Sequence, residues 1–344
     1  MRTVVVEEPG RVSVQVRLDP ELPSADGAVV AVEASAICGS DLHLYDGDLP
    51  LFPVAIGHEA VGRVVEVGPD VARFAVGDRV LVAAVAGCGR CDGCATGDPV
   101  TCRAGPRVFG AGELGGAQSD LLAVPAADFQ LLEVPEGVSD EAALLLTDNL
   151  ATGWAGARRA ELAPGGTVAV LGLGAVGLCA VRAALVQGAG RVLAVDPVEG
   201  RRRRAAAAGA TILDASTADA VRDAVFEATD GRGADAVIDA VATDATLDAA
   251  FAAVRAGGTI SVLGVHDMAP YPLPVLTGVY RSITLRMTTA PVQAAWRDLV
   301  PLVQDGRLDT TGIFTHDFAL DDAAAAYEAA AARSGDCMKV RFHP

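Results

Sequence analysis

Four cysteines lie close together in the chain, at Cys88, Cys91, Cys94 and Cys102. Four thiolates at such short spacing can close a tetrahedral shell around zinc, and a shell of four sulfur ligands is structural rather than catalytic. A ferredoxin-type iron–sulfur cluster also begins with C-x₂-C-x₂-C, but it needs its next Cys three residues on, followed by Pro. Here the gap before Cys102 is seven residues and no Pro follows. We therefore expect a structural zinc site in the loop 88–102.

A second group of metal-binding residue types lies upstream, in the segments 38–43 (CGSDLH) and 57–59 (GHE). Together they supply a thiolate, an imidazole and neighbouring carboxylates, on segments that we expect to be loops after strands. Catalytic zinc uses such mixed sets, with three protein ligands and one position open to water or substrate. A single Cys or His is more often packed in a core, so the residue types alone leave the role of this group open.

A glycine-rich segment, GLGAVG at 172–177, follows a predicted strand and opens a predicted helix. In the dinucleotide-binding pattern Gly172 permits the tight turn, Gly174 lets the backbone approach a pyrophosphate, and Gly177 lets helix and strand pack closely. The helix N-terminus then directs its free N–H groups at the phosphate. The segment therefore predicts a dinucleotide site.

Asp196 stands at the end of the next predicted strand, 24 residues after Gly172. A carboxylate there accepts hydrogen bonds from the adenosine ribose and repels a 2′-phosphate, which favours NAD over NADP. The run of four arginines at 201–204 favours NADP, but four consecutive residues span more than one helical turn and cannot all face the cofactor. We expect NAD, with NADP as the alternative.

The elements that must position these residues fall into two kinds. Short apolar runs punctuated by Gly, Pro and Asp predict a β-rich N-terminal part, with strands at 4–6, 12–16, 28–32, 62–67 and 79–85. From about residue 163, strands at 167–171, 191–195, 211–213, 236–239, 259–263 and 283–287 alternate with helices at 175–187, 199–208, 218–229 and 245–256. This alternation predicts a doubly wound parallel sheet. Helices at 296–304 and 320–333 and a strand at 338–342 follow.

Composition narrows the class of protein. The chain has 344 residues, 51% of them hydrophobic and 21% charged, which excludes global disorder. A net charge of −17 argues against nucleic-acid or anionic-membrane partners, zinc-ribbon nucleic-acid binding included. The N-terminus carries no signal-peptide pattern and the longest apolar run is too short to span a bilayer. Seven cysteines, an odd number, favour free or metal-bound thiols in the cytoplasm.

These motifs, together with Asp148 in TDNLATG at 147–153, resemble in order and spacing those of the zinc-dependent medium-chain alcohol dehydrogenases, over essentially the full length. The resemblance implies an α/β protein with a GroES-like β-rich catalytic domain at 1–150 and a Rossmann domain, a doubly wound parallel sheet, at 151–290. It also implies that the C-terminal segment 291–344 returns to the catalytic domain.

The resemblance further implies a catalytic zinc held by Cys38 and His58. Alcohol dehydrogenases commonly add a second Cys, but this chain has Asp148 in that region. It is similar in this to bacterial secondary-alcohol members, so Asp148 is the expected third ligand and Glu59 the reserve.

The remaining functional residues are also implied by the resemblance. Asp41 matches the partner that fixes the tautomer of the zinc-bound His. Ser40 and His43 match the family's proton relay. The expected cofactor-binding residues are Thr152, Gly172, Gly174, Ala175, Val176, Gly177, Asp196, Arg201, Val241, Gly264, Val265 and Lys339.

The implied reaction is hydride transfer between a small alcohol or carbonyl compound and NAD, with two zinc ions per chain. Ala84 stands at a position where some primary-alcohol members of the family have a bulky side chain. Its small side chain favours secondary or branched alcohols as substrates. Polyol, amino-alcohol and formaldehyde-type substrates stay open. A non-catalytic zinc- and nucleotide-binding scaffold is the alternative of another class, although every catalytic position is filled. Family members are usually homodimers or homotetramers.

Overall fold

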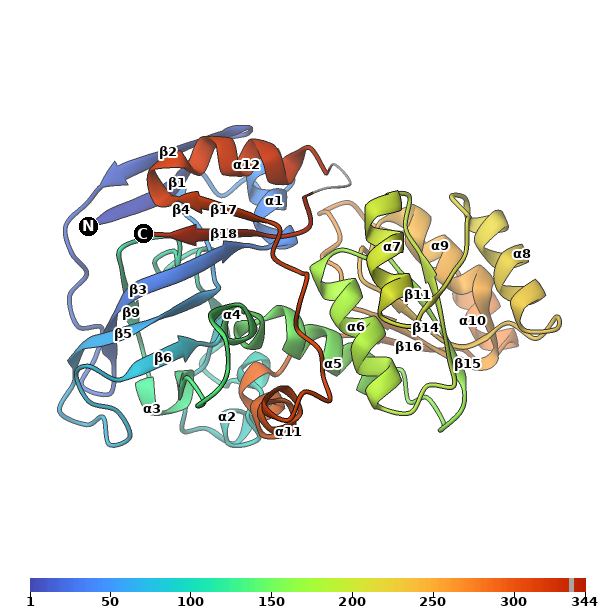
Figure 1. Cartoon of the computed structure of the whole chain (residues 1–344), viewed down its shortest axis with the longest axis horizontal. Helices are drawn as coiled ribbons and strands as arrows, with labels where there is room; N and C mark the ends of the chain where they lie inside the picture. The colour runs from blue at the N-terminus through green and yellow to red at the C-terminus, as the bar shows by residue number, and fades with distance from the viewer. Residues whose placement is uncertain (334–336) are drawn as a thin grey trace. The chain divides into compact units, whose positions relative to one another are not determined.

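The computed structural model describes residues 1–333 and 337–344 and divides into two compact units. Unit 1 consists of Met1–Ala151 and Pro291–Pro344, and unit 2 of Thr152–Ala290 (Figure 1). The chain thus leaves unit 1 once, after Ala151, and returns to it at Pro291. Among the described residues, no helix has both the length and the apolar character needed to cross a bilayer.

The larger sheet of unit 1 has the strand order β10-β6-β5-β3-β18-β17, with β9 also paired to β3. All of these pairs are antiparallel except β17 with β18. The C-terminal strand therefore lies beside β3, with Val340 opposite Ile37. The strands are β3 Ala28–Ile37, β5 Ala60–Val67, β6 Arg79–Val82, β9 Leu121–Val124, β10 Leu131–Glu133, β17 His316–Ala319 and β18 Val340–His343.

The predicted strand 79–85 is wrong in its second half, because β6 ends at Val82 and a short β7 occupies Val85–Ala86. Between them the N–H groups of Ala83 and Ala84 donate to Gln130 O and Thr147 O. Their partners lie on other segments, so the ladder stops there.

A three-stranded sheet, β2-β1-β4, packs with helix α12 around a hydrophobic core of unit 1. Its members are β1 Arg2–Glu8, β2 Arg11–Val16, β4 Val54–Ala55 and α12 Ala323–Ala331. Alternate residues of β1, Val4 and Val6, pack there with Ile56, Tyr327 and Phe342. The C-terminal segment thus supplies part of the core around the N-terminal strands.

Unit 1 also contains helices α1 Gly39–Asp46, α3 Ala127–Gln130, α4 Asp140–Thr147 and α11 Val292–Gln304, while α5 Asn149–Arg159 crosses the unit boundary. Helix α11 is amphipathic and buries Trp296 and Leu299. The indole of Trp296 donates to Leu146 O at 2.9 Å, which fixes α11 to the end of α4.

Unit 2 is a six-stranded parallel sheet in the order β13-β12-β11-β14-β15-β16. Numbered within the unit this is 3-2-1-4-5-6, the doubly wound order, so the predicted α/β class and Rossmann-type sheet are confirmed. The strands are β11 Thr167–Leu171, β12 Arg191–Val195, β13 Thr211–Ile212, β14 Ala234–Asp239, β15 Val254–Val262 and β16 Thr284–Met287; the helices are α6 Ala175–Val186, α7 Glu199–Ala207, α8 Ala218–Ala228, α9 Asp244–Ala253 and α10 Val275–Tyr280.

Every residue of β11 is buried, as expected for a central parallel strand covered on both faces. The predicted helix 245–256 is too long, because α9 ends at Ala253 and Val254 already pairs with Ala234 as the first residue of β15. The carboxyl ends of β11, β12, β14 and β15 lie at one edge of the sheet, which is where α/β proteins of this type bind ligands.

Candidate metal centres and nucleotide loop

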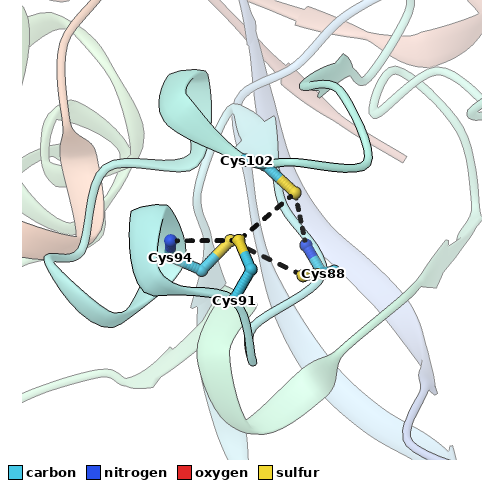
Figure 2. Close-up of side chains that lie close together, drawn as sticks. All are labelled: Cys88, Cys91, Cys94 and Cys102. Carbon is cyan, nitrogen blue, oxygen red and sulfur yellow. Dashed lines mark hydrogen bonds between the residues drawn. The ribbon is translucent and has the colours of Figure 1, made fainter.

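The four clustered cysteines converge in space (Figure 2). Cys88 follows β7, Cys91 caps helix α2 (Asp92–Ala95), Cys94 lies within that helix, and Cys102 follows the 3₁₀ turn Pro99–Thr101. Their sulfur atoms all lie within 4.8 Å of one another, and the Cys88–Cys94 and Cys91–Cys102 pairs are 4.0 Å apart. A tetrahedron with zinc–sulfur bonds of about 2.3 Å has edges of about 3.8 Å, so the four thiols fit a structural zinc ion.

Backbone N–H groups favour thiolate in this loop. Those of Cys94 and Arg103 donate to Cys91 Sγ at 3.5 Å and lower the pKa of Cys91 to about 6. Burial instead raises the pKa of Cys94 to about 12. Bound zinc would favour the thiolate form of all four residues.

A second cluster brings together one ligand atom each from Cys38, His58, Glu59 and Asp148, all within 4.8 Å. His58 and Glu59 lie between β4 and β5, and Asp148 lies between α4 and α5. The expectation of a loop after Cys38 is wrong. Cys38 is the N-cap of α1, and Asp41, three residues on, accepts the Cys38 N–H at 2.9 Å as in a capping box.

The geometry within the cluster suits a mixed metal site. Asp148 Oδ2 lies 3.4 Å from both Cys38 Sγ and His58 Nε2. The other imidazole nitrogen, Nδ1, lies 3.3 Å from Asp41 Oδ1. A proton on Nδ1 leaves the Nε2 lone pair free to bind metal.

Glu59 is the member of this cluster whose side chain is fully buried. Its Oε1 accepts hydrogen bonds from Lys339 Nζ at 2.7 Å and from Asn149 Nδ2 at 3.1 Å. Its Oε2 is buried without a hydrogen-bond partner among residues 1–333 and 337–344. An unpartnered buried carboxylate oxygen beside a thiol and an imidazole fits a cation, because zinc accepts sulfur, nitrogen and carboxylate ligands.

Asn149 is a residue of this cluster that the sequence reasoning missed. Its amide donates to Asp148 Oδ2 at 2.9 Å as well as to Glu59. It therefore holds the two carboxylates side by side. The available signal was its position directly after Asp148 in the sequence.

The burial of so many ionisable groups displaces their pKa values. Burial and the charge of Asp148 raise the pKa of Cys38. Burial alone lowers the pKa of His58, but the charges of Asp41 and Cys38 raise it well above its ordinary value. Burial raises the pKa of Glu59, and the charge of Lys339 opposes that shift. A bound dication would favour the anionic forms of the acids.

Ser40 and His43 lie on α1 but outside the four-residue cluster. Both are half-buried. His43 Nδ1 lies 2.9 Å from Asp48 Oδ2, and its side chain is 24% exposed. His43 thus lies on the helix that Cys38 caps, with its side chain partly exposed to solvent.

The glycine-rich segment of unit 2 links β11 to α6. Gly172 has φ +82°, which only glycine adopts easily, and a Cβ there would collide with Val241. At Gly177 a Cβ would collide with the carbonyl of Gly172, whereas at Gly174, the N-cap of α6, it would meet no atom within 4 Å. The backbone therefore has the tight turn expected at Gly172 and the close helix–strand packing expected at Gly177. At Gly174 it leaves the open space expected for the approach of a pyrophosphate.

The other predicted cofactor residues of unit 2 lie around this turn or on α5. Ala175 and Val176 begin α6. Val241 and Val265 are 36% and 42% exposed after β14 and β15, and a Cβ at Gly264 would collide with the Val241 backbone. Thr152 is buried on α5.

Asp196 directly follows β12 and is 3% exposed. Its Oδ2 accepts the N–H of Leu173 and its Oδ1 that of Val198, both at 2.7 Å. Arg201 Nη1 lies 3.7 Å from Oδ2. Arg202 instead donates to the carbonyls of Asp196 and Pro197.

Lys339, which the resemblance implies to lie near both the cofactor pyrophosphate and Glu59, contacts Glu59 in the structure. Its ammonium donates to Glu59 and to Ile37 O at 3.2 Å, and the residue is 3% exposed. Burial alone lowers the pKa of Lys339, but the negative charges of Glu59 and Cys38 raise it. Its contacts belong to the second metal cluster, and its role toward a cofactor stays a prediction.

Comparisons with known proteins identify the family of the chain. The alcohol dehydrogenase GroES-like domain family matches residues 24–136, and the zinc-binding dehydrogenase family matches residues 175–305. A probable zinc-binding alcohol dehydrogenase of Mycobacterium tuberculosis is 59% identical, covering 100% of this chain and 89% of its own. An alcohol dehydrogenase of Cupriavidus necator is 31% identical, covering 100% and 99%.

Among solved structures, the alcohol dehydrogenase TADH from Thermus sp. ATN1 is similar with a TM-score of 0.91 and 36% identity, covering 100% of this chain and 99% of its own. The GroES-like character of unit 1 is thereby confirmed. The chain belongs to the zinc-dependent alcohol dehydrogenases of the medium-chain dehydrogenase/reductase superfamily.

Proposed function

We propose that this chain is an NAD-dependent alcohol dehydrogenase in which Cys38, His58 and Asp148 hold a catalytic zinc ion. The observation that carries the proposal is the buried mixed cluster of thiol, imidazole and carboxylates. Glu59 is the reserve ligand, since its Oε2 faces no hydrogen-bond donor among the described residues. The four-cysteine loop holds a second, structural zinc ion.

When bound, zinc would lower the pKa of an alcohol oxygen and NAD would accept the hydride. His58 presents Nε2 to the metal because its Nδ1 proton is held by Asp41. Asn149 and Lys339 hold the carboxylates of Asp148 and Glu59. The ammonium of Lys339 compensates the buried charge of Glu59.

The alcohol proton leaves through Ser40 and His43. Both side chains lie on α1 within five residues of Cys38, and the ring of His43 is partly exposed and bound to Asp48. An imidazole can accept a proton on one ring nitrogen and release one from the other, so it can pass a proton to water.

Asp196 supports NAD as the cofactor. A carboxylate has about four acceptor sites, and N–H groups occupy two of those on Asp196. The remainder can accept the ribose hydroxyls, while the negative charge disfavours a 2′-phosphate. Arg201 is close enough to Asp196 to orient it.

The substrate is a small secondary or branched alcohol. Ala84 is buried, and its N–H donates to the carbonyl of Thr147, the neighbour of Asp148. Because the side chain of Ala84 is only a methyl group, we expect it to leave more room for substrate than the bulky side chain of some primary-alcohol members.

The protein self-associates through unit 2. One edge of its sheet is β16, and α10, which precedes that strand in the chain, carries apolar residues that are 61–80% exposed: Val275, Leu276, Val279 and Tyr280. An unpaired sheet edge beside exposed apolar side chains suits a second copy in a homodimer or homotetramer. Light scattering should give a smaller species for Val279→Lys than for the control Val65→Lys, and equal masses would contradict this. Cysteines that form no disulfide within the described residues suit the cytoplasm.

The test of function combines metal content with turnover. The purified protein should hold two zinc ions per chain, of which a mild chelator removes one, and should form NADH from 2-butanol. Asp148→Asn should lose most of kcat and the labile zinc. Asp140→Asn, an exposed carboxylate on the adjoining helix α4, should keep both. One zinc ion and no alcohol-dependent NADH formation would overturn the proposal.

A further inference from the structure

A chain of buried hydrogen bonds runs from His58 away from the proposed zinc site to helix α12. Beyond Asp41, whose Oδ1 faces His58, the Oδ2 atom accepts from Gln118 Nε2 at 3.2 Å. Gln118 Oε1 in turn accepts from the hydroxyl of Tyr327 at 2.9 Å. Gln118 and Tyr327 are fully buried and Asp41 is 2% exposed.

We propose that Gln118 and Tyr327 are positioning residues that act through Asp41 to fix the tautomer and the ring orientation of His58. This inference rests on the proposed function, because it assigns these side chains a role toward the catalytic zinc. Among the described residues, neither side chain hydrogen-bonds to a member of the metal cluster.

The direction of every bond in the chain follows from its chemistry. Gln118 Nε2 faces two groups that can only accept, the carboxylate of Asp41 and the carbonyl of Ala36, each at 3.2 Å. Turning the amide over would set its oxygen against both acceptors, so the nitrogen belongs there. The outer atom is then Oε1, which carries no hydrogen.

Tyr327 must therefore donate its hydroxyl proton to Gln118. Burial raises the pKa of Tyr327 well above its ordinary value, so this proton is retained. At the inner end Asp41, as a carboxylate, can only accept from Nδ1 of His58. The result is a fixed polarity that leaves His58 Nε2 as the metal-binding atom.

The frame around Gln118 is rigid. Its N–H donates to Ile56 O at 3.1 Å, and its carbonyl accepts from Val4 N at 2.9 Å. Its side chain lies against Gly57, where φ is +99° and a Cβ would come within 2.5 Å of Gln118 Cγ. The glycine that precedes His58 thus makes room for the amide that orients His58's partner.

Tyr327 is fixed as firmly, because its ring packs at 5.3 Å from the ring of Tyr45. It also lies in the core formed with Ile56 and Phe342. Helix α12, on the C-terminal segment, therefore contributes to the geometry of the N-terminal metal cluster.

Three variants test the inference in the full-length zinc protein. Tyr327→Phe removes only the hydroxyl, and Gln118→Met keeps the length of the side chain but removes both polar ends. Tyr45→Phe is the matched control, since it deletes a hydroxyl from the adjoining ring, which lies outside the hydrogen-bond chain. Because Gln118→Met is the larger change, Tyr327→Phe keeps the test valid even if Gln118→Met does not fold.

The readouts are the rate at which a chelator removes the labile zinc ion and the visible spectrum with cobalt at the catalytic site. Removing the partner of a metal-bound His costs about 10–100-fold in affinity or activity, and we expect about tenfold faster release for both chain variants. The cobalt bands should shift, and kcat should fall while KM for NAD stays unchanged. The control should match the wild type.

Release rates and cobalt spectra equal to those of Tyr45→Phe would overturn the inference. If the wild type holds two metal ions but oxidises no alcohol, the proposed function fails, and the release rates and spectra still decide the inference. If the wild type holds only the structural metal ion, both are overturned.

Discussion

The ammonium of Lys339 lies 2.7 Å from Oε1 of Glu59, and both side chains are buried beside Cys38 and Asp148. Lys339 is the only lysine of the chain. It joins the C-terminal segment to the segment that carries His58. A buried charge left without its partner is costly, so this pair is a sensitive point of unit 1.

Replacing Lys339 by Met should destabilise unit 1 by about 3–5 kcal/mol, because Glu59 would remain buried without a cation. Trp296 lies in unit 1 and Trp154 in unit 2, so urea unfolding followed by Trp296 fluorescence in a Trp154→Phe background reports on unit 1. The double variant Lys339→Met/Glu59→Gln should recover much of the loss. A double variant no more stable than the single one would contradict the charge argument.

Replacing Cys102 by Ser should remove one zinc ion and loosen α11. The loop packs on this helix, since Ala294 N donates to Gly97 O at 3.1 Å and Gln293 donates to Val85 O at 3.1 Å. Hydrogen exchange in α11 should accelerate, while Cys179→Ala, a buried thiol of α6, should keep both zinc ions. Unchanged exchange in α11 would show that the loop does not support it.

Replacing Asp196 by Ser should lower kcat/KM for NAD by about 10–100-fold, the equivalent of one hydrogen bond to a charged group. The ratio of NADP to NAD activity should rise, because the repulsion of a 2′-phosphate is removed. Glu199→Gln, an exposed carboxylate on α7, is the control. The cofactor assignment fails if the ratio does not change.

Replacing Ala84 by Phe should reduce kcat/KM for 2-alkanols relative to primary alcohols, on the order of 10–100-fold, by filling space beside Thr147 and Asp148. Ala84→Ser, a change of one atom, should leave the preference close to that of the wild type. Equal losses for both classes of alcohol would argue against a role in substrate choice.

Asp235 makes the stability of unit 2 depend on pH. Burial alone raises its pKa, but the N–H of Thr167 at 2.8 Å and the guanidinium of Arg255 at 2.7 Å hold the pKa below its usual value. A carboxylate whose pKa is lowered on folding stabilises the fold above its unfolded pKa, and this contribution is lost as pH falls through the folded pKa.

The variant Asp235→Asn should therefore be less stable than the wild type by about 1–3 kcal/mol at neutral pH. The difference should vanish in acid, below both pKa values. Urea unfolding followed by Trp154 fluorescence in a Trp296→Phe background, over a pH series, measures this. A difference independent of pH would point to packing instead of charge.

The parallel sheet was the part of the fold most readily predicted from sequence. Strands β11 and β12 match their predicted ranges because strands buried on both faces are continuous apolar runs. Helix α1 was missed, since eight residues with little apolar periodicity, GSDLHLYD, give no helical signal. Its start depends on capping by Cys38 and Asp41, which the sequence reasoning had assigned only to metal chemistry.

Local spacing predicted the four-cysteine loop, whereas the second metal cluster needed the family resemblance. The roles of its residues stay predictions. Gln118 and Tyr327 gave no signal in the sequence, because each is far along the chain from its partner. Gln118 lies 77 residues after Asp41, and Tyr327 lies 209 residues after Gln118. Partners so distant meet only through tertiary packing, which periodicity cannot report.

The return of the chain to unit 1 after unit 2 imposes an order on biosynthesis. Unit 2 is continuous, so it can fold while the ribosome is still translating. Strand β3 meanwhile lacks its neighbour β18, and Glu59 lacks the lysine encoded 280 positions later. A nascent chain thus displays an open sheet edge at β3, and Glu59 lacks its cation, until β18 and Lys339 have emerged from the ribosome. Chaperones and proteases could distinguish unfinished molecules from finished ones by this difference alone.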